Sequence, residues 1–431
     1  MHYKGTVKAM QARKSGSRVL IYSHDTFGLG HLRRCRAIAH ALVENYSKLS
    51  VLILSGSPII GSFDFRARVD FVRVPGVIKL RNGEYTSLNL HLDITETLAL
   101  RQSIIRHTAD IFAPDLFIVD KEPLGLRGEV ESTLKLLKAR DVRLVLGLRD
   151  ILDDPETLAE EWRRKKAIPA IRDLYDEVWI YGARDIYAPL DGIPMPAGVA
   201  DKITYTGYLC PRLPSVPAAM VMPEITKNPY LLVTTGGGGD GEGLIDWVLS
   251  AYELGATRTG PAPLPALIML GPFMNPDAQA AFTHRAARLP AVTILTFDSH
   301  IEQFEAGATG IVAMGGYNTF CEILARDKPA LIVPRATPRL EQTIRAERAS
   351  DLGLITMLTD PSENGAGGRD PEIMLKALLD LPHQAPPSHA SITGINEGLS
   401  KVADIAAASL KPETRITRQA KRRAKDTPSH A

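Results

Sequence analysis

A histidine that follows two glycines is the clearest candidate for a catalytic group in this sequence. Gly28, Gly30 and His31 belong to a short loop that comes directly after an apolar run at residues 18–23, which is typical of a buried strand. Glycines let the backbone approach a ligand closely, and a helix that begins near His31 places the imidazole in the positive end of the helix dipole. That field lowers the imidazole pKa and favours the neutral ring. His31 is therefore predicted to be a general base that takes a proton from an attacking hydroxyl or water.

A second glycine turn, at residues 315–322, is suited to a nucleotide. It follows an apolar run at 311–314 and precedes a helical pattern, so it is predicted to turn backbone N–H groups and a helix N-terminus toward an anion. The residues that we assign to this site are Gly315, Gly316, Asn318, Thr319 and Glu322. Asn318 or Thr319 is expected to cap the helix. Glu322 then lies about one turn in, where its carboxylate can accept two hydrogen bonds from a diol such as a ribose.

Three further segments of the second half are candidates for the same ligand. A turn of four glycines follows an apolar run at 230–234, and its free N–H groups suit phosphate or sugar oxygens; no Gly-Lys-Ser/Thr follows, so the turn is not a P-loop. Polar residues after the strand at 330–333 could meet phosphate and sugar hydroxyls, and an aromatic residue that ends the strand at 292–297 could flank a base. The residues assigned in this way are Gly236, Gly237, Gly238, Gly239, Phe297, Arg335, Glu341 and Gln342.

Charged residues also end two strands of the first half. Residues 120–122 (Asp-Lys-Glu) follow one apolar run and residues 149–150 (Arg-Asp) follow the next, so these groups could line an acceptor pocket or serve as helix caps. Asp120 is a candidate to assist His31. No Asp-x-Asp pattern stands at a strand end in this half, so we predict no metal-held diphosphate and assign no metal ligand.

The elements that must position these groups alternate between strand and helix. This alternation predicts two tandem doubly wound, Rossmann-like α/β domains with a cleft between them, and a proline-rich stretch at 189–229 marks their boundary. The predicted parts are a disordered lead-in at 1–17, an acceptor-side α/β domain at 18–205, a nucleotide-sugar-binding α/β domain at 206–385, a final helical segment at 386–410 and a basic disordered tail at 411–431. Single helices are expected at 93–112, 155–175 and 392–410.

Composition is typical of a globular protein from a reducing compartment. Of the 431 residues, 45% are hydrophobic and 23% charged, and the three cysteines are too widely separated for a metal site or a disulfide framework. No apolar run is long enough to span a membrane, and residues 1–17 lack the apolar segment of a secretory signal. The tail carries a charge of +5 against −3 for the rest, so it is either a solvated end or a contact for anionic lipid or nucleic acid. We expect a cytoplasmic protein, with peripheral contact at the inner face of the membrane as an option.

Taken together, these motifs resemble the GT-B glycosyltransferases, specifically the MurG-like group that transfers N-acetylglucosamine from UDP-GlcNAc. Residues 28–31 resemble the glycine loop ending in His after the family's first strand, 236–239 the glycine loop that opens its second domain, and 315–322 its donor turn with a ribose-binding Glu. Residues 341–342 match a polar pair that contacts the donor sugar, although a Gln-Gln pair is commoner. The resemblance implies an inverting, metal-independent hexosyltransferase that uses a UDP-sugar and no cofactor, and a final helix that crosses back to the first domain.

Two other interpretations stay open. The loop at 28–31, with Arg34 three residues on, also resembles PseG-type UDP-sugar hydrolases, which share this architecture and use the His to activate water. We assign Gly28, Gly30 and Arg34 to the acceptor side. The other interpretation is a non-catalytic nucleotide-sugar-binding protein or a scaffold with a basic tail. The acceptor of a transferase could be lipid-linked, a polysaccharide or a small molecule, and no specific nucleic-acid partner is predicted.

Overall fold

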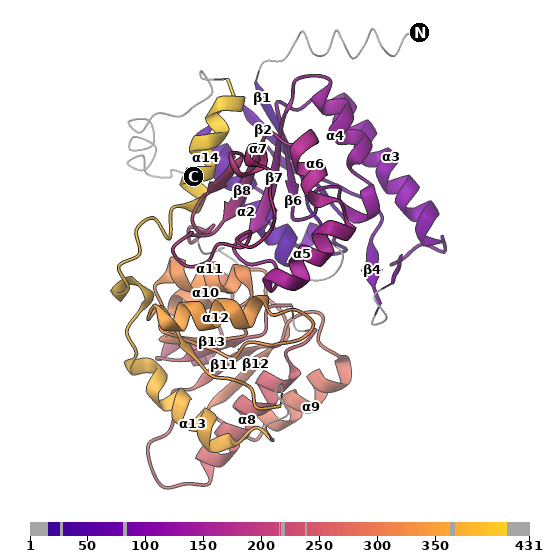
Figure 1. The fold of residues 1–431 in the computed structure, drawn as a ribbon. Helices are drawn as coiled ribbons and strands as arrows, with labels where there is room; N and C mark the ends of the chain where they lie inside the picture. Colours follow the sequence, from indigo (N-terminus) through magenta and orange to yellow (C-terminus); the bar gives the residue numbers. More distant parts are fainter. Residues whose placement is uncertain are drawn as a thin grey trace, which may run out of the picture.

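Two parallel β-sheets, one from each half of the chain, form the framework of the protein (Figure 1). The computed structural model describes residues 16–25, 29–80, 84–214, 216, 220–237, 239–362 and 367–411. Within each sheet all paired strands run parallel, and helices connect them. The predicted fold class, two tandem doubly wound α/β domains, is confirmed. We call the part built on the first sheet the first domain and the part built on the second sheet the second domain.

The first sheet has the strand order β3-β2-β1-β6-β7-β8-β9. Its strands are β1 (Ser17–Tyr22), β2 (Leu49–Ser55), β3 (Val69–Arg73), β6 (Leu116–Asp120), β7 (Arg143–Arg149), β8 (Glu177–Tyr181) and β9 (Ile203–Tyr205). The order reverses between β1 and β6, and open α/β sheets bind ligands outside the carboxyl ends of the strands at such a switch point. Tyr22 pairs with Val119 across these strands, so the loop after β1 and the end of β6 meet there.

Helices and one small hairpin complete the first domain. The helices are α2 (Gly30–Asn45), α3 (Ile94–Phe112), α4 (Glu131–Lys138), α5 (Pro155–Arg164), α6 (Ala167–Leu174) and α7 (Ala197–Ala200), with 3-10 turns at Ile60–Ser62 and Leu126–Gly128. The single helix expected at 155–175 is two helices, because Lys166 adopts a left-handed conformation with a φ of 52° between them. β4 (Val77–Lys79) and β5 (Tyr85–Ser87) form an antiparallel hairpin that no sequence pattern predicts, since strands of three residues show no clear periodicity.

The second sheet has the strand order β12-β11-β10-β13-β14-β15. Its strands are β10 (Leu231–Thr234), β11 (Ala266–Met269), β12 (Val292–Leu295), β13 (Gly310–Ala313), β14 (Ala330–Ile332) and β15 (Thr356–Met357). Its helices are α8 (Glu242–Ala256), α9 (Pro276–Ala286), α10 (Ile301–Gly307), α11 (Tyr317–Arg326), α12 (Glu341–Asp351) and α13 (Pro371–Asp380). Thr234 pairs with Ala313, so the two glycine turns that follow β10 and β13 leave the same edge of the sheet.

The chain crosses between the domains twice, and the two crossings lie side by side. The Tyr208 N–H donates to the Ile395 carbonyl at 2.9 Å, and the Gly398 N–H donates to the Tyr208 carbonyl at 3.1 Å. α14 (Gly398–Ile405) then packs on α2, where the Tyr46 hydroxyl donates to the Ala403 carbonyl at 2.7 Å (Figure 1). The final helix is therefore shorter than the expected 392–410 and continues only as a 3-10 turn, Ala406–Ser409. The domain boundaries expected at 205 and 385 stay predictions.

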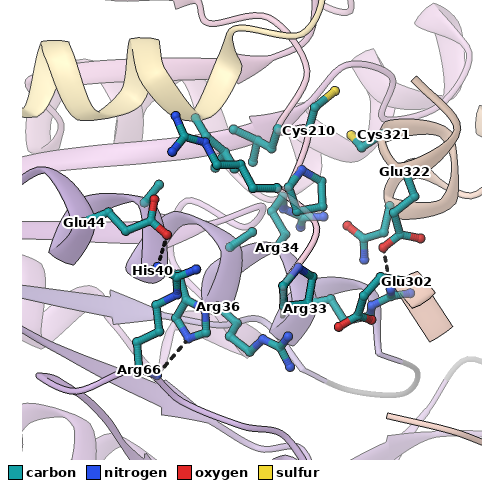
Figure 2. Close-up of a pocket in the computed structure, with 18 of the residues that line it drawn as sticks. Arg33, Arg34, Arg36, His40, Glu44, Arg66, Cys210, Glu302, Cys321 and Glu322 are labelled. Carbon is teal, nitrogen blue, oxygen red and sulfur yellow. Dashed lines mark hydrogen bonds and ion pairs between the residues drawn. The ribbon is translucent and has the colours of Figure 1, made fainter. Parts of the chain in front are cut away.

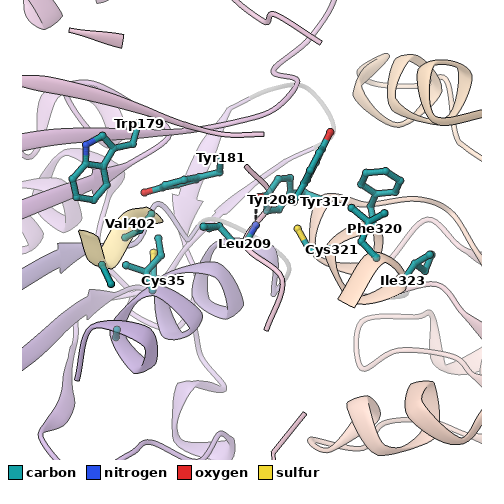
Figure 3. Close-up of a cluster of buried hydrophobic side chains, with 14 of the residues drawn as sticks. Cys35, Trp179, Tyr181, Tyr208, Leu209, Tyr317, Phe320, Cys321, Ile323 and Val402 are labelled. Atoms are coloured by element: carbon teal, nitrogen blue, oxygen red, sulfur yellow. Dashed lines mark hydrogen bonds between the residues drawn. The ribbon is translucent and has the colours of Figure 1, made fainter. Parts of the chain in front are cut away.

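Aromatic side chains fill the junction between the domains (Figure 3). Tyr208 of the linker stacks on Tyr317 of α11, with ring centroids 6.0 Å apart, and meets Phe320 edge-on at 5.1 Å. The Leu209 N–H donates to the Tyr317 hydroxyl at 3.3 Å. The linker thereby fixes α11, the helix that carries the predicted donor turn. The described part of the chain contains no helix whose length and apolarity would carry it across a membrane.

Candidate functional site

His31 and Asp120 are in contact at the switch point of the first sheet. His31 is the second residue of α2, and Asp120 is the last residue of β6. The Nδ1 atom of His31 lies 2.5 Å from Oδ2 of Asp120. A carboxylate oxygen accepts, so Nδ1 donates and Nε2 is left to accept. Asp120 is 2% exposed. A histidine with one nitrogen held by a buried carboxylate and the other free has the arrangement of a general base.

Arg34 completes this group in a way that the sequence did not indicate. Its Nε and Nη2 atoms donate to Oδ1 of Asp120 at 2.9 Å and 2.7 Å, and Nη2 lies 2.9 Å from Oδ2. Nη2 also lies 3.0 Å from Nδ1 of His31. Arg34 is only 3% exposed, and its guanidinium is bound to Asp120; its assignment to the acceptor side stays a prediction. Arg34 fixes the orientation of Asp120, and Asp120 in turn orients the ring of His31.

Burial and neighbouring charges set the protonation states. Burial favours a higher pKa for Asp120, but Arg34 and His31 outweigh it and hold that pKa well below its ordinary value. Burial lowers the pKa of His31, and Asp120 opposes this shift only in part. The ring of His24 meets that of His31 edge-on at 5.7 Å, and burial, with the charge of Lys121, also lowers the pKa of His24. At neutral pH His31 is therefore neutral and Asp120 is ionised.

The predicted donor turn places the N-terminus of α11 against the start of α2, where Asn318 contacts Gly30. The helix begins at Tyr317 with Gly316 as its N-cap, and no side chain caps it. The expected capping by Asn318 or Thr319 is wrong, because both residues lie inside the first helical turn. Gly315 takes a left-handed φ of 77° at the bend between β13 and the helix. The first N–H groups of a helix have no partner within it, so this end is suited to an anion.

Two polar contacts join this turn to α2. The Asn318 side-chain amide donates to the Gly30 carbonyl at 3.0 Å, and Glu322 forms an ion pair with Arg33. Glu322 is 5% exposed, and its second oxygen has no partner among the described residues. Burial and the charge of Glu322 raise the pKa of Glu305 well above its ordinary value. Arg33 holds the carboxylate that we assign to a ribose.

A cavity of about 460 Å³ opens between the domains beside this ion pair (Figure 2). Asn318 and Glu322 line it from α11, and residues 299–300 line it from the loop before α10. It continues between α2 and the linker at 209–214. Its volume lies within the range of small-molecule sites. Phe297, which we expected to flank a base, is exposed and does not line this cavity.

The glycine turn after β10 lies at the same edge of the second sheet as the donor turn. Gly236 has a φ of 69°, and the Gly237 carbonyl accepts a hydrogen bond from the Phe273 N–H at 3.0 Å. Gly239 is exposed. Gly238 of this turn and Gly28 of the first-domain loop lie outside the described residues.

The polar residues predicted after β14 contact other protein groups. Arg335 pairs with Asp240 of the glycine turn at 2.8 Å. With its amide oriented to satisfy both atoms, Gln342 donates to the Met314 carbonyl at 2.8 Å and accepts from Nε of Arg335 at 3.0 Å. Gln342 therefore ties the start of α12 to the loop that precedes α11.

Glu341 reaches across to the first domain. It forms an ion pair with Arg149, and both side chains are largely buried. Burial favours a higher pKa for Glu341, but Arg149 and other cations lower it to about 2. Glu341 stands where the commoner Gln-Gln pair has a neutral residue. Its charge forms the ion pair with Arg149, which joins the two domains.

A second, fully buried ion pair also joins the domains. Arg345 of α12 donates to the two carboxylate oxygens of Asp150 at 2.7 Å and 2.6 Å, and each side chain is 1% exposed. A third donor of Arg345 contacts the Gly315 carbonyl at 2.9 Å. The pair thus supports the donor turn directly. Asp150 was only a weak candidate from the sequence and Arg345 was missed, because no local pattern indicates a partner 195 residues away.

We compared the chain with known proteins. No protein-family model matches the sequence, and no curated protein matches it. Several solved structures match the whole arrangement. Medicago truncatula UGT71G1 in complex with UDP-glucose is 14% identical, with a TM-score of 0.59 over 93% of this chain and 100% of that chain. The S. aureus MnaA–UDP structure is 12% identical, with a TM-score of 0.56 over 91% and 96%. Acinetobacter baumannii MurG is 12% identical, with a TM-score of 0.52 over 90% and 98%.

The chain has the GT-B fold. The matches extend over both sheets and over nearly the whole of each relative. Identities of 12–14% show the fold alone, and proteins named for different activities share it. The MurG-like subgroup suggested by the motifs therefore stays a prediction. The described residues bring together no group of three or more His, Cys, Asp or Glu side chains that could hold a metal ion.

Proposed function

We propose that the protein transfers a hexose or N-acetylhexosamine from a UDP-sugar to an acceptor hydroxyl, with inversion and without a metal ion. The observation that carries the proposal is the contact between His31 and buried Asp120 at the start of α2, which Asn318 joins to the first turn of α11. One domain offers a base and the other offers an anion site. UDP or UDP-glucose in structures of the same fold supports the donor class.

In this proposal the first domain activates the acceptor. The acceptor oxygen attacks the anomeric carbon of the donor sugar while the bond from that carbon to the UDP oxygen breaks. Nε2 of His31 takes the hydroxyl proton, and the ionised Asp120 stabilises the imidazolium that forms. Arg34 fixes Asp120 through two donor atoms, so the base cannot rotate away. A single displacement of this kind inverts the anomeric centre.

The second domain holds the donor and stabilises the leaving group. Negative charge develops on the diphosphate as the glycosidic bond breaks, and the free N–H groups at the start of α11 are aimed at the opening where that charge appears. Glu322 binds the ribose diol through Oε2, which has no partner among the described residues, and a second hydrogen bond requires Arg33 to release Oε1. Gln342 is assigned to the donor sugar, which requires it to exchange one of its contacts with Met314 and Arg335.

Hydrolysis of a UDP-sugar is the second candidate, and the placement of Arg34 favours it. Arg34 is the residue that extends the resemblance to PseG-type hydrolases, and it lies within the base group itself. A water molecule in place of the acceptor would give up its proton to the same nitrogen of His31. The two activities differ in their products, because the hydrolase releases free sugar when no acceptor is present.

The test combines turnover with nucleotide binding. UDP-glucose and UDP-GlcNAc are incubated with the protein, with and without an acceptor panel, and UDP and free sugar are measured. His31→Ala should lower turnover by about 10²–10⁴-fold and leave the UDP affinity from calorimetry unchanged. His284→Ala, at the far end of α9, is the control. Near-normal turnover of His31→Ala would exclude this base, and a wild-type protein that binds neither UDP nor UDP-sugars would exclude the donor class.

A further inference from the structure

Lys121 lies next to the group formed by His31, Asp120 and Arg34. It follows Asp120 directly at the carboxyl end of β6 and takes a left-handed φ of 68°. Its N–H donates to the Gly147 carbonyl at 2.8 Å, which holds the residue at this edge of the sheet. The side chain is partly buried, and none of the residues that the structure describes forms a hydrogen bond or an ion pair with its ammonium group.

The carboxylates around Lys121 are already paired with other cations. The pairs at this edge are Arg34–Asp120, Arg149–Glu341, Lys165–Glu122, Arg339–Asp153, Arg339–Glu161 and Arg345–Asp150. Glu122 and Glu341 are the two acids whose charges act most on Lys121, and each is held by its own partner. Lys121 is therefore a positive charge without a carboxylate partner among the described residues at this edge of the sheet.

Arg149 adds a second free donor at the same edge. β6 and β7 are neighbours, with Asp120 opposite Gly147, so the end of β7 lies beside Lys121. Arg149 pairs with Glu341 through Nη2, but its Nε atom is buried and has no partner in the described part of the chain. Burial first, and the charge of Arg149 second, lower the pKa of Lys121 to about 8. The two cations are thus close enough to repel each other.

An anion bound at this edge of the sheet would give a partner to the ammonium group of Lys121 and to the Nε atom of Arg149. A buried cation without a partner is costly, and a charge-assisted hydrogen bond to an anion offsets that cost. The charge of Lys121 also acts on both His24 and His31, so the anion would lie beside the proposed base. The donor diphosphate is assigned elsewhere, to the N-terminus of α11, which contacts the first domain at Gly30.

We propose that Lys121 and Arg149 form a subsite for a carboxylate or phosphate group on the substrate that meets His31, and that the acceptor is therefore an anionic molecule. The assignment to an acceptor rests on the proposed transferase function, whereas the subsite itself rests on the ammonium group of Lys121 and the Nε atom of Arg149, neither of which has a partner among the described residues. A neutral alcohol or sugar would leave the charge of Lys121 without a counter-ion. The inference narrows the acceptor from any hydroxyl compound to uronic acids, phosphorylated compounds and similar acids.

The test reads binding and needs no turnover. The full-length protein, with ¹³C-labelled lysine and saturating UDP, is titrated with methyl β-D-glucuronide and with the neutral methyl β-D-glucoside. The Lys121 signal, assigned by its loss in Lys121→Arg, should shift saturably with the glucuronide only. Lys121→Met should weaken glucuronide binding by about tenfold or more, as the loss of a charge-assisted hydrogen bond predicts. Lys121→Arg should retain the affinity within about threefold, and Lys165→Met, a paired lysine at the same edge, is the matched control.

Other outcomes would overturn either the subsite itself or its assignment to the acceptor. An equal shift with the glucoside, or no shift with the glucuronide, inorganic phosphate or UDP-glucuronic acid, would remove the subsite. A shift with UDP-glucuronic acid in the absence of UDP, but none with methyl β-D-glucuronide, would place the anion on the donor sugar and overturn the acceptor assignment. Failure of the proposed function is distinguishable, because it shows as lost UDP binding or absent turnover in the wild-type protein.

Discussion

Replacement of Asp120 by Asn tests whether Asp120, Arg34 and His31 act as one unit. Asparagine keeps the shape of the side chain but removes its charge. Arg34 then stays buried opposite a neutral amide, and His31 loses the carboxylate that fixes its Nδ1 proton. The substitution should therefore lower both the free energy of unfolding and the turnover, for two separate reasons.

The structure sets the expected magnitudes. Removing one partner of a buried ion pair costs about 3–5 kcal/mol, and the full range applies because Asp120 and Arg34 are 2% and 3% exposed. The double variant Asp120→Asn/Arg34→Met leaves no unpaired charge, so its cost should fall below the sum of the single variants by about 2 kcal/mol or more. Turnover of Asp120→Asn should fall by about 10²–10⁴-fold, since the imidazole loses its tautomer and its counter-charge.

The wild type, Asp120→Asn, Arg34→Met and the double variant form a double-mutant cycle. Urea unfolding of these four proteins, followed by circular dichroism, measures the coupling free energy between Asp120 and Arg34, and UDP release measures turnover. Glu129→Gln is the matched control. It breaks the Arg101–Glu129 pair, in which both side chains are 1% exposed, so it should cost similar stability while turnover stays within about threefold. Single-variant costs that add within about 0.5 kcal/mol would refute the idea of one unit, and normal turnover in Asp120→Asn would refute the orienting role of the carboxylate.

Two further predictions concern the donor and the base. Glu322→Gln should weaken UDP binding by about 1–3 kcal/mol in calorimetry, with the exposed Glu242→Gln of the same domain as control; an unchanged affinity would remove Glu322 from the nucleotide site. The pH dependence of kcat/KM follows from the lowered pKa of His31: the imidazole is already neutral at pH 7, so the rate should be flat above its ordinary value of 6.5 and fall only below it, as protonation removes the base. A rate that keeps rising well above that pH would point to a different group.

The sheets could be predicted from the sequence because buried parallel strands are continuous apolar runs. The run at 116–120 coincides with β6, and the run at 177–181 coincides with β8. Local backbone events could not be predicted in the same way. The break between α5 and α6 depends on one lysine, Lys166, in a left-handed conformation, and a residue type that is usually helical gives no warning of it.

The candidate site shows the same division between local and distant signals. The glycine turns and the first turn of α2 could be predicted, because strand, turn and helix are consecutive in the chain. The ion pairs that hold these side chains in place could not be predicted, because they join residues that are distant in the sequence. Arg33 meets Glu322 across 289 residues of sequence, and one chain without homologues carries no signal of that contact. The same holds for the contact of Arg34 with Asp120, which spans 86 residues of sequence.

The two adjacent crossings between the domains make the second domain an insertion that is attached along a single line. Gly207 and Gly394 allow the close approach, since a Cβ atom on Gly207 would lie 2.6 Å from the Gly394 carbonyl oxygen. Two attachment points that are hydrogen-bonded to each other leave one axis about which we expect the second domain to rotate, since sliding or twisting would break these hydrogen bonds. Such a rotation would have to break ion pairs that join the domains, among them Arg33–Glu322, Arg149–Glu341, Arg345–Asp150 and Arg339–Asp153.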